Sequence, residues 1–163
     1  MLMAAMKAKP CPVIPSGLKR CALYHLEAGL RIVLGRAEAL AKEELGLELR
    51  DCLIMRAANS TPAFSQGFIA DCLGVNRNVM VLEIDRLEKR GYLKRERKRE
   101  NRREQAILLT AKGRRTVAAI ERLDAKLEAS LFRPASARAR AALVQWARGV
   151  IEGDASDIRP SRG

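Results

Sequence analysis

A three-residue turn, 74–76, constrains the fold of this chain most, because it separates two segments that both have helical patterns. Ser65 precedes the first segment and Asn76 precedes the second, and both residue types cap helix N-termini. Gly74 can end the first helix and Gly91 the second. Two helices joined by a short turn that contains glycine form a helix-turn-helix. We therefore predict helices over 66–73 and 77–90, with three residues of the second in the core: Met80, Ile84 and Leu87.

The segment after the helix pair is strongly basic. Between residues 94 and 104 it holds seven Lys or Arg against three Glu, and an apolar run stands on either side. The flanking segments 92–97 and 104–110 are therefore interpreted as the strands of a hairpin with a charged tip. A basic hairpin directly after a helix-turn-helix makes a winged helix. In that fold the second helix enters the major groove of DNA, and the hairpin reaches the backbone or the minor groove.

The charge of the whole chain has the same sign. Its formal net charge is +12 and its pI is near 10.2, which favours a polyanionic partner: nucleic acid first, an anionic membrane surface second. Few aromatic residues interleave with the basic ones, which counts against base stacking on single strands.

Helical periodicity also flanks the winged helix. A long pattern runs over 18–45, a shorter one over 49–58, and further helices are expected after Thr110 and over 137–152. The predicted fold class is therefore mostly α with a small β-wing. We expect a loose arm at 1–15, a first dimerisation helix within 16–48, the winged-helix lobe at 49–110, dimerisation helices within 111–152 and a tail at 153–163.

The central part of the chain resembles the MarR family of bacterial transcriptional regulators. The similar segments are LGVNRNVMVLEIDRLEKRGYLKR (73–95) and NRREQAILLTAKGRR (101–115). They match the family's Leu-Gly-Val, its DRLEKRG run, its wing ending and its Leu-Thr-x-x-Gly motif. The resemblance implies a homodimer in which the first and the last two helices of each subunit interlock, and in which two lobes read a pseudo-palindromic operator about one DNA turn apart. The long apolar stripes of those outer helices agree with a dimer.

The candidate DNA-binding residues come from the helix pair and the wing. Residues at the start of each helix of the pair suit phosphate or base contacts, and the arginines of the wing suit the minor groove. Two departures from the family pattern affect these residues. Asn101 stands where the family has the acid that fixes the wing arginine. Apolar Val81 and Leu82 stand where the family often has polar side chains that hydrogen-bond to bases. The full set is Ser65, Gln66, Asn76, Arg77, Asn78, Val81, Arg97, Lys98, Arg99, Arg102 and Arg103.

A sensing site is a further hypothesis. One branch of the MarR family senses hydroperoxides through a first-helix cysteine near tyrosines, and here Tyr24 follows Cys21 by three residues. His25 lies next in the chain and would line a pocket for a small aromatic effector. The alternatives are a packing cysteine and an ordinary surface or core histidine. Cys52 and Cys72 are expected at core positions.

Other functions are less compatible with the sequence. There is no glycine-rich phosphate loop and no nucleophile partner for the lone histidine, so we do not expect an enzyme. With no CxxC pair we expect no metal site, and we expect no cofactor. Neither a transmembrane run nor a signal peptide is evident, so a cytoplasmic, nucleoid-associated protein is expected. The alternative function is a non-specific architectural or RNA-binding protein that uses the basic wing.

Overall fold

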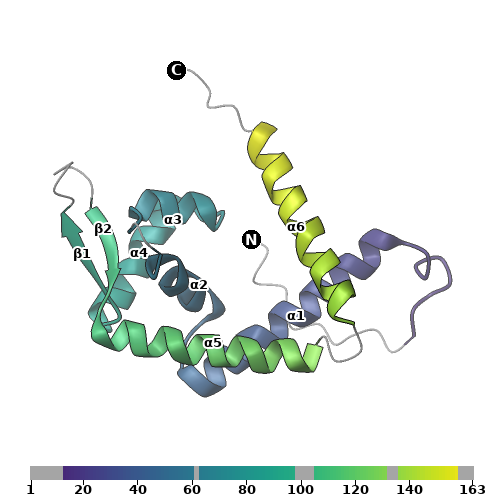
Figure 1. Cartoon of the computed structure of the whole chain (residues 1–163), viewed down its shortest axis with the longest axis horizontal. Helices are drawn as coiled ribbons and strands as arrows, with labels where there is room; N and C mark the ends of the chain where they lie inside the picture. Colours follow the sequence, from purple (N-terminus) through teal and green to yellow (C-terminus); the bar gives the residue numbers. More distant parts are fainter. Residues whose placement is uncertain (1–12, 61–62, 98–104, 132–135, 158–163) are drawn as a thin grey trace. The chain divides into compact units, whose positions relative to one another are not determined.

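The computed structural model describes residues 13–60, 63–97, 105–131 and 136–157. Two compact units are distinguished, one ending at Ala125 and the other beginning at Lys126, and each is described by itself. The elements, labelled in Figure 1, are α1 (Ala22–Leu45), α2 (Leu49–Ala58), α3 (Gln66–Cys72), α4 (Arg77–Lys89), β1 (Leu93–Arg97), β2 (Gln105–Leu109), α5 (Ala111–Leu131) and α6 (Ala137–Asp157). The predicted fold class, mostly α with a small β-wing, is confirmed.

The helix-turn-helix forms through the predicted local signals. The Ser65 hydroxyl accepts a hydrogen bond from the Phe68 N–H at the start of α3, and the Asn76 side chain accepts one from the Asn78 N–H at the start of α4. Gly74 and Gly91 follow the two helices with φ of 60° and 75°, a left-handed backbone that glycine adopts without steric cost. The pair therefore begins and ends where the sequence indicated, to within one residue.

The wing is a two-stranded antiparallel hairpin. Leu93 of β1 faces Leu109 of β2 at its base, and Arg97 faces Gln105 at the far end of the described strands. The chain before α3 joins its edge, because the Ile107 N–H donates to the Phe64 carbonyl and Ser65 bridges to Ala106. The tip, 98–104, lies outside the described residues.

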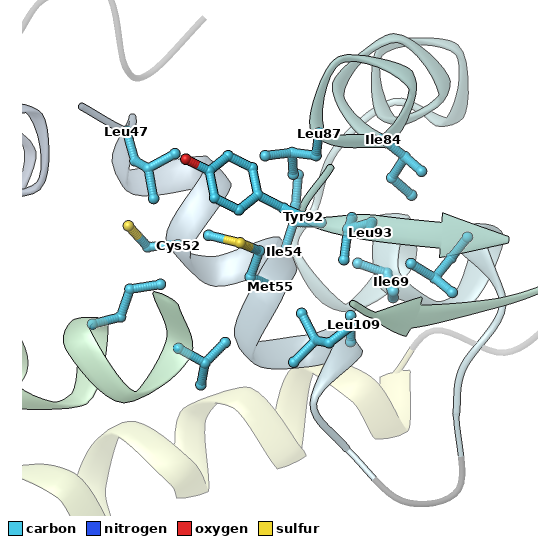
Figure 2. Packing of buried hydrophobic residues seen from close by; sticks show 14 of the residues in the cluster. Leu47, Cys52, Ile54, Met55, Ile69, Ile84, Leu87, Tyr92, Leu93 and Leu109 are labelled. Carbon is cyan, nitrogen blue, oxygen red and sulfur yellow. The ribbon is translucent and has the colours of Figure 1, made fainter. Parts of the chain in front are cut away.

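One apolar core unites the elements of the lobe (Figure 2). The expected inward face of α4 is confirmed, since Met80, Ile84 and Leu87 are fully buried. They belong to one cluster with side chains of α2, α3, the hairpin and α5, among them Ile54, Met55, Ile69, Leu93, Ile107, Val117 and Ile120. This core fixes which side of α4 remains outside.

Two of the predicted helix ends are wrong. The first helix begins at Ala22 instead of residue 18, because Pro15 to Cys21 form turns in which the Leu18 N–H donates to the Pro15 carbonyl. The last helix continues to Asp157 instead of stopping near Glu152, so it enters the segment expected to be a tail. The apolar periodicity stops there, but no proline interrupts the helix before residue 160, and the cost of one glycine, about 1 kcal/mol, does not break it.

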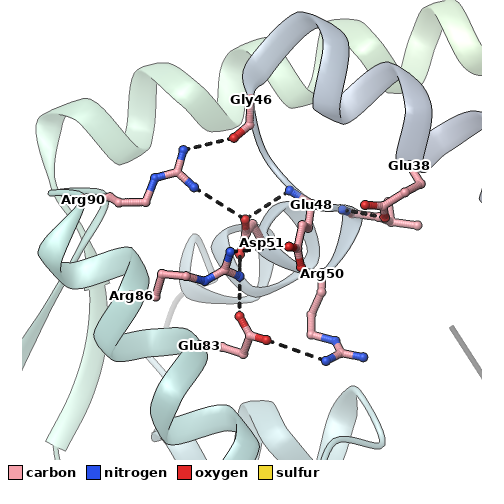
Figure 3. A network of polar contacts seen from close by, with 9 residues as sticks. Glu38, Gly46, Glu48, Arg50, Asp51, Glu83, Arg86 and Arg90 are labelled. Atoms are coloured by element: carbon pink, nitrogen blue, oxygen red, sulfur yellow. Dashed lines mark hydrogen bonds and ion pairs between the residues drawn. The ribbon is translucent and has the colours of Figure 1, made fainter. Parts of the chain in front are cut away.

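A buried carboxylate ties α2 to α4. Among the described side chains, Asp51 is the only charged one that is buried. It accepts a hydrogen bond from the Glu48 N–H at 3.1 Å, which closes a reciprocal capping box, and Arg86 donates to it from α4 at 2.6 Å. Arg90 lies 3.8 Å from the same carboxylate and donates to the Gly46 carbonyl at the end of α1 (Figure 3). Three helices are thereby joined around one negative charge.

Glycine at 113 is required by close packing. Thr110 caps α5 by accepting from the Gly113 N–H, and its hydroxyl donates to the Gly91 carbonyl. The first turn of α5 therefore lies directly against the chain between α4 and β1. A Cβ atom at 113 would overlap the backbone carbonyl oxygen of Tyr92.

Replacing Gly113 with Ala is expected to destabilise the protein by about 2 kcal/mol or more, because backbone must move to relieve that overlap. The matched control is Gly29→Ala in α1, where an added Cβ meets nothing within 4 Å and helix propensity predicts a gain of up to about 1 kcal/mol. Urea denaturation followed by circular dichroism measures both. Equal stabilities of the two variants would contradict the close-packing argument.

Replacing Arg86 with Ala is expected to cost about 1–2 kcal/mol at pH 7, because it leaves a buried carboxylate with one partner fewer. Burial already raises the pKa of Asp51 above its usual 3.8, and the Arg86 charge opposes that shift. Because the pKa of Asp51 is raised in the folded state, the charged carboxylate reduces stability as the pH rises through that pKa. As the pH falls towards 4, Asp51 takes up a proton, and the stability deficit of Arg86→Ala should shrink.

Arg31→Ala provides the control, since Arg31 pairs with Glu27 in an exposed turn of α1. Its effect should stay within about 0.5 kcal/mol at both pH values. Denaturation at pH 7 and pH 4.5 compares the variants with the parent protein. A deficit of Arg86→Ala that grows in acid would show that Asp51 is not the group that Arg86 compensates.

Candidate nucleic-acid interface

The outward face of α4 lies opposite its buried residues. Leu82 comes two positions after Met80 and two before Ile84, so the helical repeat of 3.6 residues turns it away from the core. Its side chain is 69% exposed, and that of Val81 is 37% exposed. Asn78 is also exposed and lies one turn before Leu82 on the same side. The middle of this accessible face therefore carries the apolar side chains of Val81 and Leu82.

Arg77 is held by an acidic partner. Its guanidinium donates to the Asp71 carboxylate of α3 at 2.8 and 3.3 Å, which links the two helices of the pair. The hydrogen bond with Asp71, and then the charge of Asp71, raise the pKa of Arg77. Both side chains are more than half exposed, and an exposed pair of this kind contributes little stability. The pair therefore positions Arg77 at the edge of the outward face.

Three other residues predicted to contact DNA have their side chains engaged within the lobe. The Ser65 hydroxyl and the Asn76 amide oxygen cap the two helices. The Gln66 amide oxygen accepts a hydrogen bond from Arg95 at 3.1 Å. These interactions place all three at the starts of α3 and α4, next to the outward face.

Arg95 joins the wing to both helices of the pair. From β1 it donates to Asp85 of α4 at 2.6 Å, to Glu88 of α4 and to Gln66 of α3. The Arg95 N–H also donates to Glu88 at 3.1 Å. By sequence alone, Arg95 is only one of the basic residues of the wing. The structure makes it the residue that fixes the base of the hairpin against α4.

Of the basic wing residues predicted to contact DNA, one lies within the described part of the chain. Arg97, at the end of β1, is exposed and lies beyond the contacts of Arg95. The remaining predicted wing residues, Lys98, Arg99, Arg102 and Arg103, and the divergent Asn101, lie outside the described residues. Arg97 therefore marks the end of the strand from which the charged tip departs.

The proposed sensing residues lie together at the start of α1. Cys21 is the N-cap residue and is partly buried, and its carbonyl oxygen lies 2.8 Å from Nδ1 of the exposed His25. The rings of Tyr24 and His25 meet edge to face, with centroids 5.4 Å apart. This arrangement brings the three residues into one turn.

The other two described cysteines differ in burial: Cys52 is buried and Cys72 is exposed. Cys52 is buried as expected, and burial, followed by the charge of Asp51, raises the pKa of its thiol to about 11. Cys72 was predicted at a core position, and this is wrong: it is exposed, because Ile69 and Ala70 supply the buried side of the short helix α3. Cys52 is therefore a packing residue.

The described residues contain neither a metal-binding cluster nor a membrane-spanning helix. No group of three or more His, Cys, Asp or Glu side chains among them could hold a metal ion. None of their helices combines the length and the apolar character that crossing a membrane requires.

Comparison with known proteins relates the winged-helix part of the chain to a family. Residues 47–105 match the sequence model of the MarR family. A search of curated protein sequences gave no significant match.

Solved structures with the same fold cover nearly the whole chain. The transcriptional repressor CouR bound to a 23-mer DNA duplex is 25% identical, with a TM-score of 0.76 over 86% of this chain and 99% of that one. CouR from Rhodococcus jostii RHA1 bound to p-coumaroyl-CoA is 20% identical, with a TM-score of 0.74 over 89% and 99%. A crystal structure of MarR is 22% identical, with a TM-score of 0.70 over 91% and 97%. Residues 47–105 therefore match the MarR family, and the chain has the winged helix-turn-helix fold of the solved transcriptional regulators MarR and CouR.

Proposed function

We propose that this protein is a homodimeric transcriptional repressor that binds a pseudo-palindromic operator in double-stranded DNA. The observation that carries the proposal is the winged helix itself. It presents the exposed face of α4 beside a hairpin whose strands lead into a basic tip, in a chain with a net charge of +12. A helix of this kind fits the major groove, and the positive charge matches the phosphate backbone. CouR, with the same fold, has been solved on a DNA duplex.

We propose a DNA contact for each part of this interface. Asn78, Val81 and Leu82 would face base edges, and Arg97 with the wing tip would contact the backbone or the minor groove. The starts of α3 and α4 would approach phosphates through Ser65, Gln66, Asn76 and Arg77. The Arg77–Asp71 pair is weak and exposed, so a phosphate oxygen can replace the carboxylate as its partner.

Exposed apolar side chains support the dimer. On α1, three leucines of the predicted apolar stripe are exposed in the single chain: Leu23, Leu26 and Leu30. On α6 the exposed set is Leu143, Val144, Trp146, Val150 and Ile151. Apolar stripes of this length are typical of surfaces that pack against a partner. We therefore propose that the helices within 16–48 and 111–152 form the dimer interface, and that 49–110 is the DNA-binding lobe.

Relief of repression would come from a small aromatic effector or from oxidation of a thiol. Either signal acts only if it favours a spacing of the two lobes that binds DNA poorly. The cluster of Cys21, Tyr24 and His25 on α1 supports this part of the proposal, because α1 also carries the proposed dimer surface. The related CouR structure with p-coumaroyl-CoA supports an aromatic effector.

The affinity for duplex DNA should fall steeply as salt rises, because each phosphate contact releases counterions. Replacing Arg97 with Gln should reduce the slope of log K against log salt by about 0.9 if Arg97 contacts one phosphate. Arg36→Gln on the exposed side of α1 makes the same change in net charge and should leave the slope unchanged. Gel shifts between 50 and 200 mM salt give the slopes.

Two results of that experiment would contradict the proposal. An affinity that does not depend on salt would rule out a phosphate-binding wing. Equal affinity for random duplexes and for duplexes selected by the protein would instead support the non-specific alternative.

The protein is expected to be a dimer in solution. Replacing Leu23, 77% exposed on α1, with Glu should shift it towards monomer, because a charge would enter the proposed apolar interface. Leu53→Glu on α2 is the matched control and should leave the mass unchanged, since that leucine is also exposed but lies in the lobe. Light scattering after size exclusion measures the mass, and circular dichroism checks folding. A strictly monomeric parent protein would end the dimer proposal.

A further inference from the structure

The polar residues expected to read bases are largely occupied by contacts within the lobe. The Asn76 amide oxygen caps α4, and Arg77 is paired with Asp71. Further along the same face, Asp85 is bound to Arg95 of the wing. Base reading by the outward face of α4 therefore falls on the residues between them.

Those residues are mainly apolar. Leu82 is at the centre of the outward face and is 69% exposed, and Val81 beside it is exposed as well. Neither side chain can donate or accept a hydrogen bond, so neither can recognise the polar edge of a base. One major-groove feature suits them: the C5-methyl group of thymine, the only apolar group that an unmodified base pair presents there.

Asn78 adds a polar side chain that can hydrogen-bond to a base on the same face as Leu82. It lies one helical turn before Leu82 on the same face and is exposed. An asparagine side chain pairs with the N6 and N7 atoms of adenine, the base opposite thymine. The face thus combines a group suited to adenine with groups suited to thymine methyls.

We propose that α4 recognises thymine through its C5-methyl groups, with Leu82 as the main contact and Val81 as its neighbour. The inference rests on the proposed DNA-binding function and defines the base that this surface takes. Charge complementarity favours DNA over a protein as the occupant of this apolar face. The chain carries a net charge of +12, and exposed Arg97 leads into a basic wing next to the helix.

The test removes the methyl group and leaves the hydrogen-bonding atoms in place. Duplexes retained by the protein from a random 30-base-pair pool are amplified either with thymidine or with deoxyuridine triphosphate. Uracil lacks only the C5-methyl group of thymine. Each contacted methyl is expected to be worth about a fourfold difference in affinity, so the thymine duplex should bind at least that much more tightly.

The Leu82→Ala variant shows whether the preference for thymine over uracil depends on the Leu82 side chain. Leu82 is highly exposed, so the variant should fold, and its preference for thymine over uracil should fall towards one. The matched control Leu53→Ala removes an exposed leucine from α2 and should keep the full preference. Circular dichroism confirms that both variants are folded.

The outcomes separate the inference from the function on which it rests. Equal binding of thymine and uracil duplexes by the parent protein would overturn the inference and leave DNA binding intact. A preference that persists in Leu82→Ala would also overturn it, since the protein would then be sensing the shape of the duplex. No binding of any duplex at 50 mM salt would overturn the proposed function as well.

Discussion

The carboxylate of Asp51 determines where α4 can lie in this lobe. A buried negative charge is costly unless cations and hydrogen bonds compensate it. Here Arg86 of α4 and Arg90, at the C-cap of α4, supply the cations, and the Glu48 N–H supplies a hydrogen bond. A displacement or rotation of α4 would remove these partners and bring Met80, Ile84 and Leu87 out of the core. Arg95 fixes the other side, because it holds Asp85 and Glu88 of the same helix against β1. The outward face of α4 and the direction of the wing are therefore consequences of the same set of ion pairs.

The basic residues between 86 and 97 have two different roles: some stabilise the lobe, and others are available for a phosphate backbone. Some arginines of the central segment are structural, since Arg86, Arg90 and Arg95 neutralise acids of the lobe itself. Under the proposed function, the exposed Arg97 at the end of β1 would contribute electrostatic affinity for a phosphate backbone. Selectivity would then come from the short outward face of α4, where Leu82 replaces the usual polar contacts with an apolar one. A protein of this design would bind many duplexes weakly and would gain affinity where thymine methyls meet the helix.

The sequence predicted the features that depend on local chemistry. The caps at Ser65 and Asn76 were visible because capping needs only the cap residue and the next turn of helix. The core face of α4 followed from helical spacing alone. Arg95 could not be assigned in this way, because Gln66 lies 29 residues from it and comes near only in the folded lobe. Arg77 was predicted as a DNA contact, and its pairing with Asp71 depends on how the two helices cross. Cys72 was misplaced because seven residues of helix give too little periodicity to tell its inner side from its outer one.

The most direct test of this account is to observe the methyl groups of Leu82 and Val81 when duplex DNA binds. Carbon-13 methyl spectra of the protein, labelled at leucine and valine, would be recorded as a selected operator duplex is added. The account predicts that the Leu82 and Val81 signals shift, that nuclear Overhauser contacts join Leu82 to thymine methyl protons, and that the exposed Leu53 signals stay unchanged. A duplex that binds while the signals of Leu82 and Val81 remain as in the free protein would show that α4 does not present this face to DNA.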